Sequence, residues 1–313
     1  MAVPPLVFHP DYTYPLPPGH RFPMGKFGRI RDVLVEDGVV AADAFMTPEP
    51  ASRERLEAAH RPAYVEAILA LSLPRAAERR LGLPLSEALV RRARAAVGGT
   101  MLCAQLALER GLACNIAGGS HHAHPDHGAG FCVFNDVAVA IRALQDEGAV
   151  GRVLVFDCDV HQGDGTAAFF ADDPSVFTCS IHCEANYPHT KGLSDLDIGL
   201  KPGTGDNAYL AVVRDNFETL LSRVKPGLVF YNAGVDPHGD DLLGQLTLSD
   251  DGLMARDRHV IETCLKRRMP LACVVGGGYG HDLDTLARRH STVHRAAVAL
   301  AATHGLGRRT IAA

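Results

Sequence analysis

The sequence feature that most constrains the fold is an apolar run that leads directly into acidic residues and a histidine, RVLVFDCDVHQGDG at 152–165. Residues 153–156 are all apolar and lack helical spacing, so they predict a strand that is buried on both faces, as in a parallel sheet. Burying an unpaired carboxylate is costly, so Asp157 and Asp159 require a cationic partner at the end of that strand. Residues two apart in an extended segment point the same way, which would let Asp159 and His161 share a metal ion.

The rest of the chain alternates strand and helix patterns. We expect strands at 5–8, 113–117, 153–156, 175–182, 227–234 and 271–278, and helices at 26–36, 52–59, 62–71, 86–110, 165–171, 206–223, 249–269 and 281–303, with one more from about 135. This alternation predicts the α/β class: an open, mostly parallel sheet with helices on both faces. The 313 residues hold no linker, so we expect one domain over 1–305 and a disordered tail over 306–313.

Composition excludes several kinds of function. The formal net charge is -5 and no basic run is sustained, which speaks against nucleic-acid binding. The densest basic cluster is Arg91, Arg92 and Arg94, which we interpret as a solvated helix face. We expect no signal peptide, because the start lacks a basic region followed by a long apolar core. We also expect no membrane span, because no run approaches about 18 apolar residues. The eight cysteines are scattered without a C-x-x-C pair, which predicts buried thiols and a cytoplasmic protein.

Polar residues also follow the other predicted strands, and the carboxyl ends of strands are where open α/β sheets keep their sites. His121 and His122 come directly after a Gly-Gly break that ends strand 113–117. We therefore expect both at the site, and we place His124 and His127, in the same loop, at the surface. Asp236 follows strand 227–234, where it becomes a natural partner for the metal-binding pair above.

Three glycines at 276–278 end the last predicted strand and let the backbone approach the site closely, with the Tyr279 hydroxyl presented next to them. Two long loops, 9–30 and 184–206, are predicted to form a rim. His20 and Arg21, in the first of these loops, are weaker candidates for the mouth of a site.

These parts together indicate metal-assisted hydrolysis of an amide. Two carboxylates and one imidazole suit zinc, or ferrous iron, and three protein ligands leave a position open for water, as catalytic sites do. Such a metal lowers the pKa of water toward about 7 and polarises a carbonyl. The histidine pair could then move protons, and Asp157 and Asp164 could each fix the tautomer of one histidine. Tyr279 is a neutral donor for an oxyanion.

Four motifs in this order, HH with GFC, D-x-D-x-H-x-GDG, AG-x-D and GGGY, resemble the histone deacetylase family of the arginase–deacetylase fold, from the first strand to about residue 300. The resemblance implies one catalytic zinc ion bound by Asp159, His161 and Asp236. It further implies paired His121 and His122 backed by Asp157 and Asp164, Tyr279 at the oxyanion, substrate contacts from Gly130, Phe131 and Tyr187, and a potassium ion near Asp157 and Ser180.

Within the family, Gln162 and the YNAG-x-D stretch resemble bacterial-type, class IV members, whereas Asp164 is typical of class I. The implied activity is zinc-dependent hydrolysis of acyl-lysine in a peptide or protein, or of a small acylated amine. The alternatives are an acetylpolyamine amidohydrolase, an arginase-like manganese enzyme and a member that only binds acylated ligands. Small residues around the histidines favour, by a narrow margin, a pocket that tolerates long acyl chains; the alternative is that these glycines only serve tight turns. Oligomeric state and natural substrate are left open.

Overall fold

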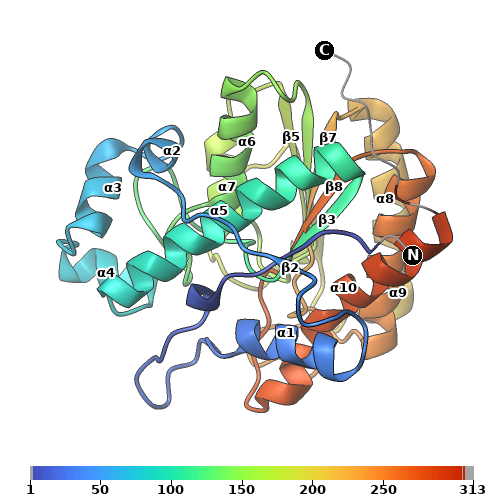
Figure 1. Cartoon of the computed structure of the whole chain (residues 1–313), viewed down its shortest axis with the longest axis horizontal. Helices are drawn as coiled ribbons and strands as arrows, with labels where there is room; N and C mark the ends of the chain where they lie inside the picture. Colours follow the sequence, from blue (N-terminus) through green and yellow to red (C-terminus); the bar gives the residue numbers. More distant parts are fainter. Residues whose placement is uncertain (1–2, 305, 307–313) are drawn as a thin grey trace.

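The computed structural model describes residues 3–304 and 306. One sheet of eight parallel strands, in the order β2-β1-β3-β8-β7-β4-β5-β6, runs through the molecule (Figure 1). The strands are β1 (Leu6–Val7), β2 (Phe45–Met46), β3 (Leu112–Asn115), β4 (Val153–Asp157), β5 (Val176–Cys183), β6 (Leu196–Leu200), β7 (Leu228–Asn232) and β8 (Leu271–Val274). The predicted single-domain α/β fold is confirmed. The predicted tail, except for residue 306, lies outside the described residues.

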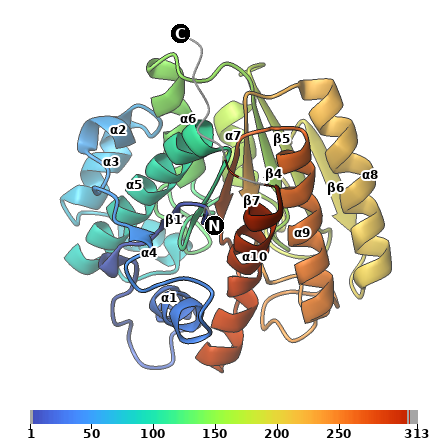
Figure 2. The same cartoon turned by 45° about the vertical axis from the view of Figure 1, so that its right-hand side comes forward.

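Helices cover both faces of the sheet. They are α1 (Lys26–Glu36), α2 (Arg53–Glu57), α3 (Pro62–Leu69), α4 (Arg75–Leu81), α5 (Glu87–Arg110), α6 (Asp136–Asp146), α7 (Asp164–Phe170), α8 (Asp206–Val224), α9 (Asp250–Lys266) and α10 (Leu283–His304), with a 3-10 turn at Pro10–Tyr12. Helices α1, α8, α9 and α10 share one hydrophobic core with the sheet, and α5, α6 and α7 share another on the opposite face. Figure 2 shows α8, α9 and α10 side by side.

The sequence of β4 explains why the sheet is covered on both sides. Leu154 and Phe156 belong to the core with α8 and α9, whereas Val153 and Val155 belong to the core with α5 and α6. All four are at most 3% exposed, because successive strand side chains point to opposite faces and a helix layer covers each face. The apolar run therefore folds as predicted, and the polar residues that follow it lie at the carboxyl edge of the sheet.

Several elements differ from the sequence prediction. The loop 184–206 contains β6, an edge strand in which Leu196, Ile198 and Leu200 alternate with more exposed residues. Helix α4 and strand β2 were also not predicted. Strands β3, β7 and β8 end two to four residues earlier than expected, so the three glycines of 276–278 lie in a turn beyond the sheet rather than in a strand.

Arg92 contradicts the interpretation of its cluster as a solvated face. Its side chain is 4% exposed, and the guanidinium carbon lies 5.0 Å from the Phe27 ring centroid and 5.8 Å from that of Phe22. Of its two neighbours, Arg91 is exposed and Arg94 donates from Nε to the carbonyl of Ala51. Helix α5 turns Arg92 inward, where aromatic faces take the place of solvent.

Two expectations from composition can also be compared with the structure. All eight cysteines are free and buried, as predicted. Among the described helices, none has both the length and the apolar composition that a bilayer crossing requires.

Candidate active site

The polar end of β4 lies between two other strand ends. Asp157 is the last residue of β4, and its partners in the sheet are Ser180 on β5 and Asn232 on β7. The Asn232 side chain donates from Nδ2 to Oδ1 of Asp157 at 3.0 Å. The carboxyl edge of the parallel sheet therefore gathers the polar groups that the sequence placed after separate strands.

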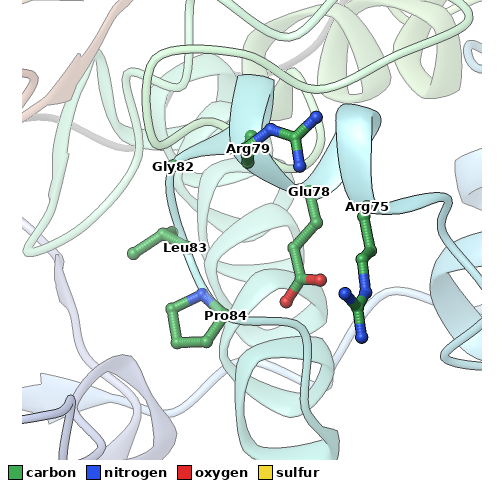
Figure 3. A pocket seen from close by; sticks show the side chains of 6 residues that line it. All are labelled: Arg75, Glu78, Arg79, Gly82, Leu83 and Pro84. Carbon is green, nitrogen blue, oxygen red and sulfur yellow. The ribbon is translucent and has the colours of Figure 1, made fainter.

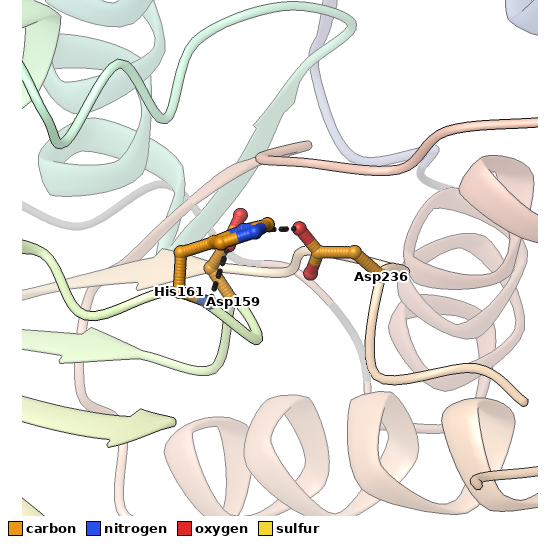
Figure 4. Close-up of side chains that lie close together, drawn as sticks. All are labelled: Asp159, His161 and Asp236. Carbon is orange, nitrogen blue, oxygen red and sulfur yellow. Dashed lines mark hydrogen bonds and ion pairs between the residues drawn. The ribbon is translucent and has the colours of Figure 1, made fainter. Parts of the chain in front are cut away.

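Three of these groups lie close enough to share a metal ion. One ligand atom each from Asp159, His161 and Asp236 falls within 4.8 Å of the others, and all three residues are buried. Nδ1 of His161 lies 3.1 Å from Oδ1 of Asp159 and 3.1 Å from Oδ2 of Asp236 (Figure 4). Figure 4 shows the imidazole and the two carboxylates pointing toward one another from the loops after β4 and β7.

The electrostatics of this triad indicate that the site needs positive charge. Burial and the nearby charge of Asp159 raise the pKa of Asp236 to about 7. Burial by itself would lower the pKa of His161, but hydrogen bonds to both carboxylates outweigh it and raise that pKa to about 10. A divalent cation would supply the same compensation, and two carboxylates with one imidazole are a suitable ligand set for zinc or iron. The residues present therefore fit the implied metal.

A glycine turn holds these ligands in place. The Gly277 N–H donates to Oδ2 of Asp159 at 2.6 Å. A Cβ at Gly277 would lie 2.1 Å from Oδ2 of Asp236 and 2.7 Å from Oδ2 of Asp159, so no larger residue fits without displacing a ligand. The close backbone approach predicted for the three glycines is confirmed at this position.

The two adjacent histidines stand next to the triad, each with its own carboxylate. Nδ1 of His121 lies 2.7 Å from Oδ2 of Asp157, Nδ1 of His122 lies 2.6 Å from Oδ1 of Asp164, and the two ring centroids are 4.1 Å apart. Burial lowers the pKa of His121, but Asp157 and Asp159 outweigh it and raise it to about 9. Burial and the charge of His121 lower the pKa of His122 to about 4, which leaves this ring neutral near pH 7.

The sequence predicted that His124 lies at the surface, but in the structure it also contacts the site. Its Nε2 lies 3.2 Å from Oδ2 of Asp164, and its side chain is 23% exposed. Burial would raise the pKa of Asp164, but hydrogen bonds with His122 and His124 outweigh it and hold that pKa well below its usual value. His127 stacks on His124 with a centroid distance of 4.5 Å and is itself partly exposed.

Tyr279 stands on the other side of the triad, with its ring centroid 6.2 Å from that of His161. It is 8% exposed, and burial together with the charges of Asp159 and Asp236 raises the pKa of its hydroxyl well above 10, so the group stays protonated and can donate. Its backbone N–H donates to Oδ2 of Asp241 at 2.7 Å. Asp241 was not singled out from the sequence.

Lys26 is a second residue that the sequence did not reveal. Its side chain is 1% exposed, and Nζ lies 3.3 Å from the carbonyl oxygen of Gly276 and 3.2 Å from that of Gly278. Burial lowers the pKa of Lys26 to about 8, although Asp236 and Asp159 partly oppose this. The lysine thus supports the turn that carries Tyr279, and no spacing or motif in 26–36 points to it.

Arg256 on α9 is the third such residue. Its guanidinium, fully buried, donates from Nη1 to the carbonyl of Gly234 at 2.6 Å and to that of Cys158 at 3.3 Å, and it pairs with Asp257 at 2.9 Å. These carbonyls belong to the segments that carry Asp159 and Asp236. The helical pattern of 249–269 gave no sign of a buried charge pair.

The two residues predicted to form tunnel walls lie beside other candidate site residues. The Tyr187 ring centroid lies 4.8 Å from that of His122, and the Phe131 centroid lies 6.0 Å from that of Tyr279. Gly130 has φ +54°, and a Cβ there would lie 2.6 Å from the His122 ring. A hollow of about 440 Å³, which we call the mouth hollow, is lined by these residues and opens to solvent; Arg21 also lines it.

His20, the other candidate from the first loop, does not line the mouth hollow. Its Nε2 lies 3.0 Å from the carbonyl oxygen of Gly82, and its ring centroid lies 6.1 Å from that of Phe131. It instead lines a separate hollow of about 680 Å³, together with Arg21 and Tyr279.

Below the histidines the space is small. A cavity of about 30 Å³ lies among Phe22, Arg92, Gly118, Gly119, His121 and Gly277. A Cβ at Gly118 would lie 2.5 Å from Oδ2 of Asp136, and one at Gly119 would lie 2.5 Å from Oδ1 of Asn232. Polar side chains and tight turns therefore fill the volume that the run of glycines suggested.

The residues expected near potassium are adjacent but otherwise engaged. Ser180 Oγ lies 3.0 Å from Nδ1 of His182 and accepts from the N–H of Gly163 at 3.4 Å, while Asp157 contacts His121 and Asn232. The potassium ion stays a prediction.

Comparison with known proteins agrees with this geometry. The chain is 53% identical over 293 residues to an uncharacterized protein of Picosynechococcus sp., covering 94% of this chain and 98% of that protein. It is 33% identical over 269 residues to histone deacetylase 2 of Arabidopsis thaliana, covering 83% and 70%. The crystal structure of a histone deacetylase homologue from Aquifex aeolicus has the same fold, with a TM-score of 0.79, 24% identity and coverage of 94% and 84%.

The bacterial homologue is consistent with the bacterial-type resemblance seen in the motifs. The model of the histone deacetylase domain matches residues 20–296, which include every strand of the sheet except β1 and every candidate site residue. The chain therefore belongs to the histone deacetylase family.

Proposed function

We propose that this protein is a zinc-dependent deacylase that hydrolyses the amide of an acyl-lysine side chain. The observation that carries the proposal is the convergence, at one point below the mouth hollow, of a buried three-ligand cluster, a carboxylate-backed histidine pair and a protonated tyrosine. Family membership supports a deacetylase activity, while the lysine substrate and the metal are proposed from the residues of the site.

The proposed zinc ligands are Asp159, His161 and Asp236, and three protein ligands would leave one position open for water. Zinc bound there would polarise the acyl carbonyl and lower the pKa of a water molecule toward about 7. The cluster contains a single Asp-x-His and one further carboxylate, which favours one metal ion over the pair that an arginase-like reaction needs.

His122 is the proposed proton carrier, because its pKa near 4 keeps the ring neutral and Asp164 holds its Nδ1. Its Nε2 accepts a proton from the attacking water and gives it to the lysine nitrogen as the C–N bond breaks. His121, paired with Asp157, carries the positive charge that stabilises the anionic intermediate. The Tyr279 hydroxyl donates to the carbonyl oxygen as negative charge develops there.

The proposed acyl group is short. A cavity of about 30 Å³ below the histidines holds little more than an acetyl group, since each further methylene needs space of its own to gain about 0.8 kcal/mol from burial. This differs from the preference for long chains that the glycines suggested. A series from acetyl to myristoyl on one peptide tests it: we expect kcat/KM to fall steeply after acetyl, and a steady rise with length would contradict the proposal.

The activity itself is tested with zinc-loaded protein and an acetyl-lysine peptide, with N-acetylputrescine as the small-amine comparison. We expect release of acetate from the peptide at a rate that scales with bound zinc. Turnover of the polyamine alone would reassign the substrate, and turnover of neither would reject the proposed function.

A further inference from the structure

The side chains that line the mouth hollow carry a net charge opposite in sign to that of the whole chain. Three exposed arginines, Arg21, Arg79 and Arg80, line it, and no aspartate or glutamate is among its lining residues. The chain as a whole has a formal net charge of -5. Positive charge is therefore concentrated where a substrate enters, although the protein repels anions on average.

Within the described part of the chain, these three arginines have no carboxylate partner. Among the described residues, none of the three forms an ion pair within 4.0 Å, whereas eleven other arginines do. Arg80 is also close enough to act on Tyr187: burial and the charge of Asp164 raise the pKa of Tyr187 to about 12, and the charge of Arg80 partly opposes this rise. The guanidinium groups are thus available to a ligand at the tunnel entrance.

Two further hollows share lining residues with the mouth hollow. One, of about 400 Å³, lies along α4 and shares Arg79 and Gly82 with it. In Figure 3, Arg75 and Glu78 reach to one side of α4 and Arg79 projects to the other. The Glu78 carboxylate accepts from the N–H of Leu85 at 2.8 Å, so part of its charge is satisfied within the protein.

The other hollow, of about 680 Å³, shares Arg21, Leu243 and Tyr279 with the mouth hollow. It too is lined by no carboxylate. Each of the three hollows thus shares lining residues with the mouth hollow or is the mouth hollow itself, and each is lined by at least one arginine.

We propose that Arg21, Arg79 and Arg80 select acyl-lysines that lie in acidic peptide segments, with carboxylates flanking the modified residue. This rests on the proposed deacylase function and adds the substrate class. Arginine is suited to the role because its planar guanidinium binds carboxylates through two parallel hydrogen bonds. Polyamines and strongly basic peptide tails carry the same sign of charge as the mouth and are disfavoured at entry.

Three acetyl-lysine peptides that differ only at the two residues on each side, Asp, Asn or Lys, provide the test. With zinc-loaded wild-type protein at low salt we expect kcat/KM to be on the order of tenfold higher for the Asp peptide than for the Lys peptide. The ratio should shrink as salt is raised to about 0.5 M, because exposed charges are screened.

A double variant, Arg79→Glu with Arg80→Glu, should abolish or invert this order. The matched control is Arg214→Glu with Arg258→Glu: both arginines are exposed, on α8 and α9, line none of the three hollows, and the net charge changes by the same amount. The control should keep the wild-type order. Equal kcat/KM for all three peptides, or the same loss of preference in both double variants, would overturn the proposal.

Binding of fluorescent forms of the same peptides, followed by anisotropy, separates this inference from the function on which it rests. If no peptide is hydrolysed, the deacylase proposal fails; preferential binding of the Asp peptide that is lost only in the Arg79/Arg80 variant would still support the mouth's selectivity. An oligonucleotide that competes as well as the Asp peptide would assign the patch to polyanions in general and overturn the peptide assignment.

Discussion

Adding one methyl group at Gly277 should disable the site without touching a proposed ligand. A Cβ there lies 2.1 Å from Oδ2 of Asp236, so the carboxylate or the turn must move by about 0.9 Å to reach the 3.0 Å below which Cβ contacts are essentially never seen. Metal–ligand distances tolerate only about 0.2 Å. Because the same residue donates to Oδ2 of Asp159, both carboxylates are disturbed together.

We therefore expect Gly277→Ala to weaken zinc binding by at least the roughly 10–100-fold that loss of a supporting contact costs, and to lower kcat/KM with it. Zinc affinity is measured by competition with a chromogenic chelator, and occupancy by elemental analysis. The matched control is Gly151→Ala, because a Cβ at Gly151 has no heavy atom within 4 Å and its φ is not in the left-handed region.

Thermal unfolding of metal-free Gly277→Ala, compared with metal-free wild type, distinguishes a local change at the site from a loss of the fold. A Gly277→Ala protein that is folded, binds zinc with wild-type affinity and turns over at the wild-type rate would refute the reasoning that this backbone position fixes the ligand geometry.

Three other substitutions test separate parts of the site. Tyr279→Phe should lower kcat by about 10²–10³ with little change in KM, because the hydroxyl acts in the transition state; an unchanged kcat would make Tyr279 a wall residue. His122→Ala should cost at least about 10²–10⁴ in kcat with metal content near wild type, and more than His121→Ala; the reverse order in steady-state assays would exchange their roles. Arg256→Ala should lower the free energy of unfolding by about 3–5 kcal/mol in urea titrations, because it leaves Asp257 buried without its cation; a loss below about 1 kcal/mol would show that the pair is not needed.

Sequence reasoning located the residues whose chemistry is unusual for their position. An apolar strand is followed by Asp157, Asp159 and His161, although burying charge is costly. The amino-acid sequence alone shows this conflict. The parallel sheet then forced the strand ends together, so His121 and Asp236 could be assigned to the same place without knowing their distance.

Supporting residues were missed because their sequence context is ordinary. Lys26 and Arg256 lie in amphipathic helices, where a single cation normally faces solvent, and only the packing of α1 and α9 buries them. Arg92 was misplaced for the same reason. The edge strand at Leu196–Leu200 was the exception: its period-two alternation was present in the sequence, but flanking glycines and aspartates favoured a loop.

The central claim is that one metal ion, held by Asp159, His161 and Asp236, is required for amide hydrolysis. The most direct measurement is a zinc titration of metal-free protein in which bound metal and acetyl-lysine turnover are followed in the same sample, for wild type, Asp159→Ala and Asp236→Ala. We predict that wild-type activity rises in proportion to zinc and saturates at about one equivalent, as a single three-ligand site requires, and that both variants bind none and stay inactive. Activity without metal, saturation at two equivalents, or full occupancy in either variant would contradict the account.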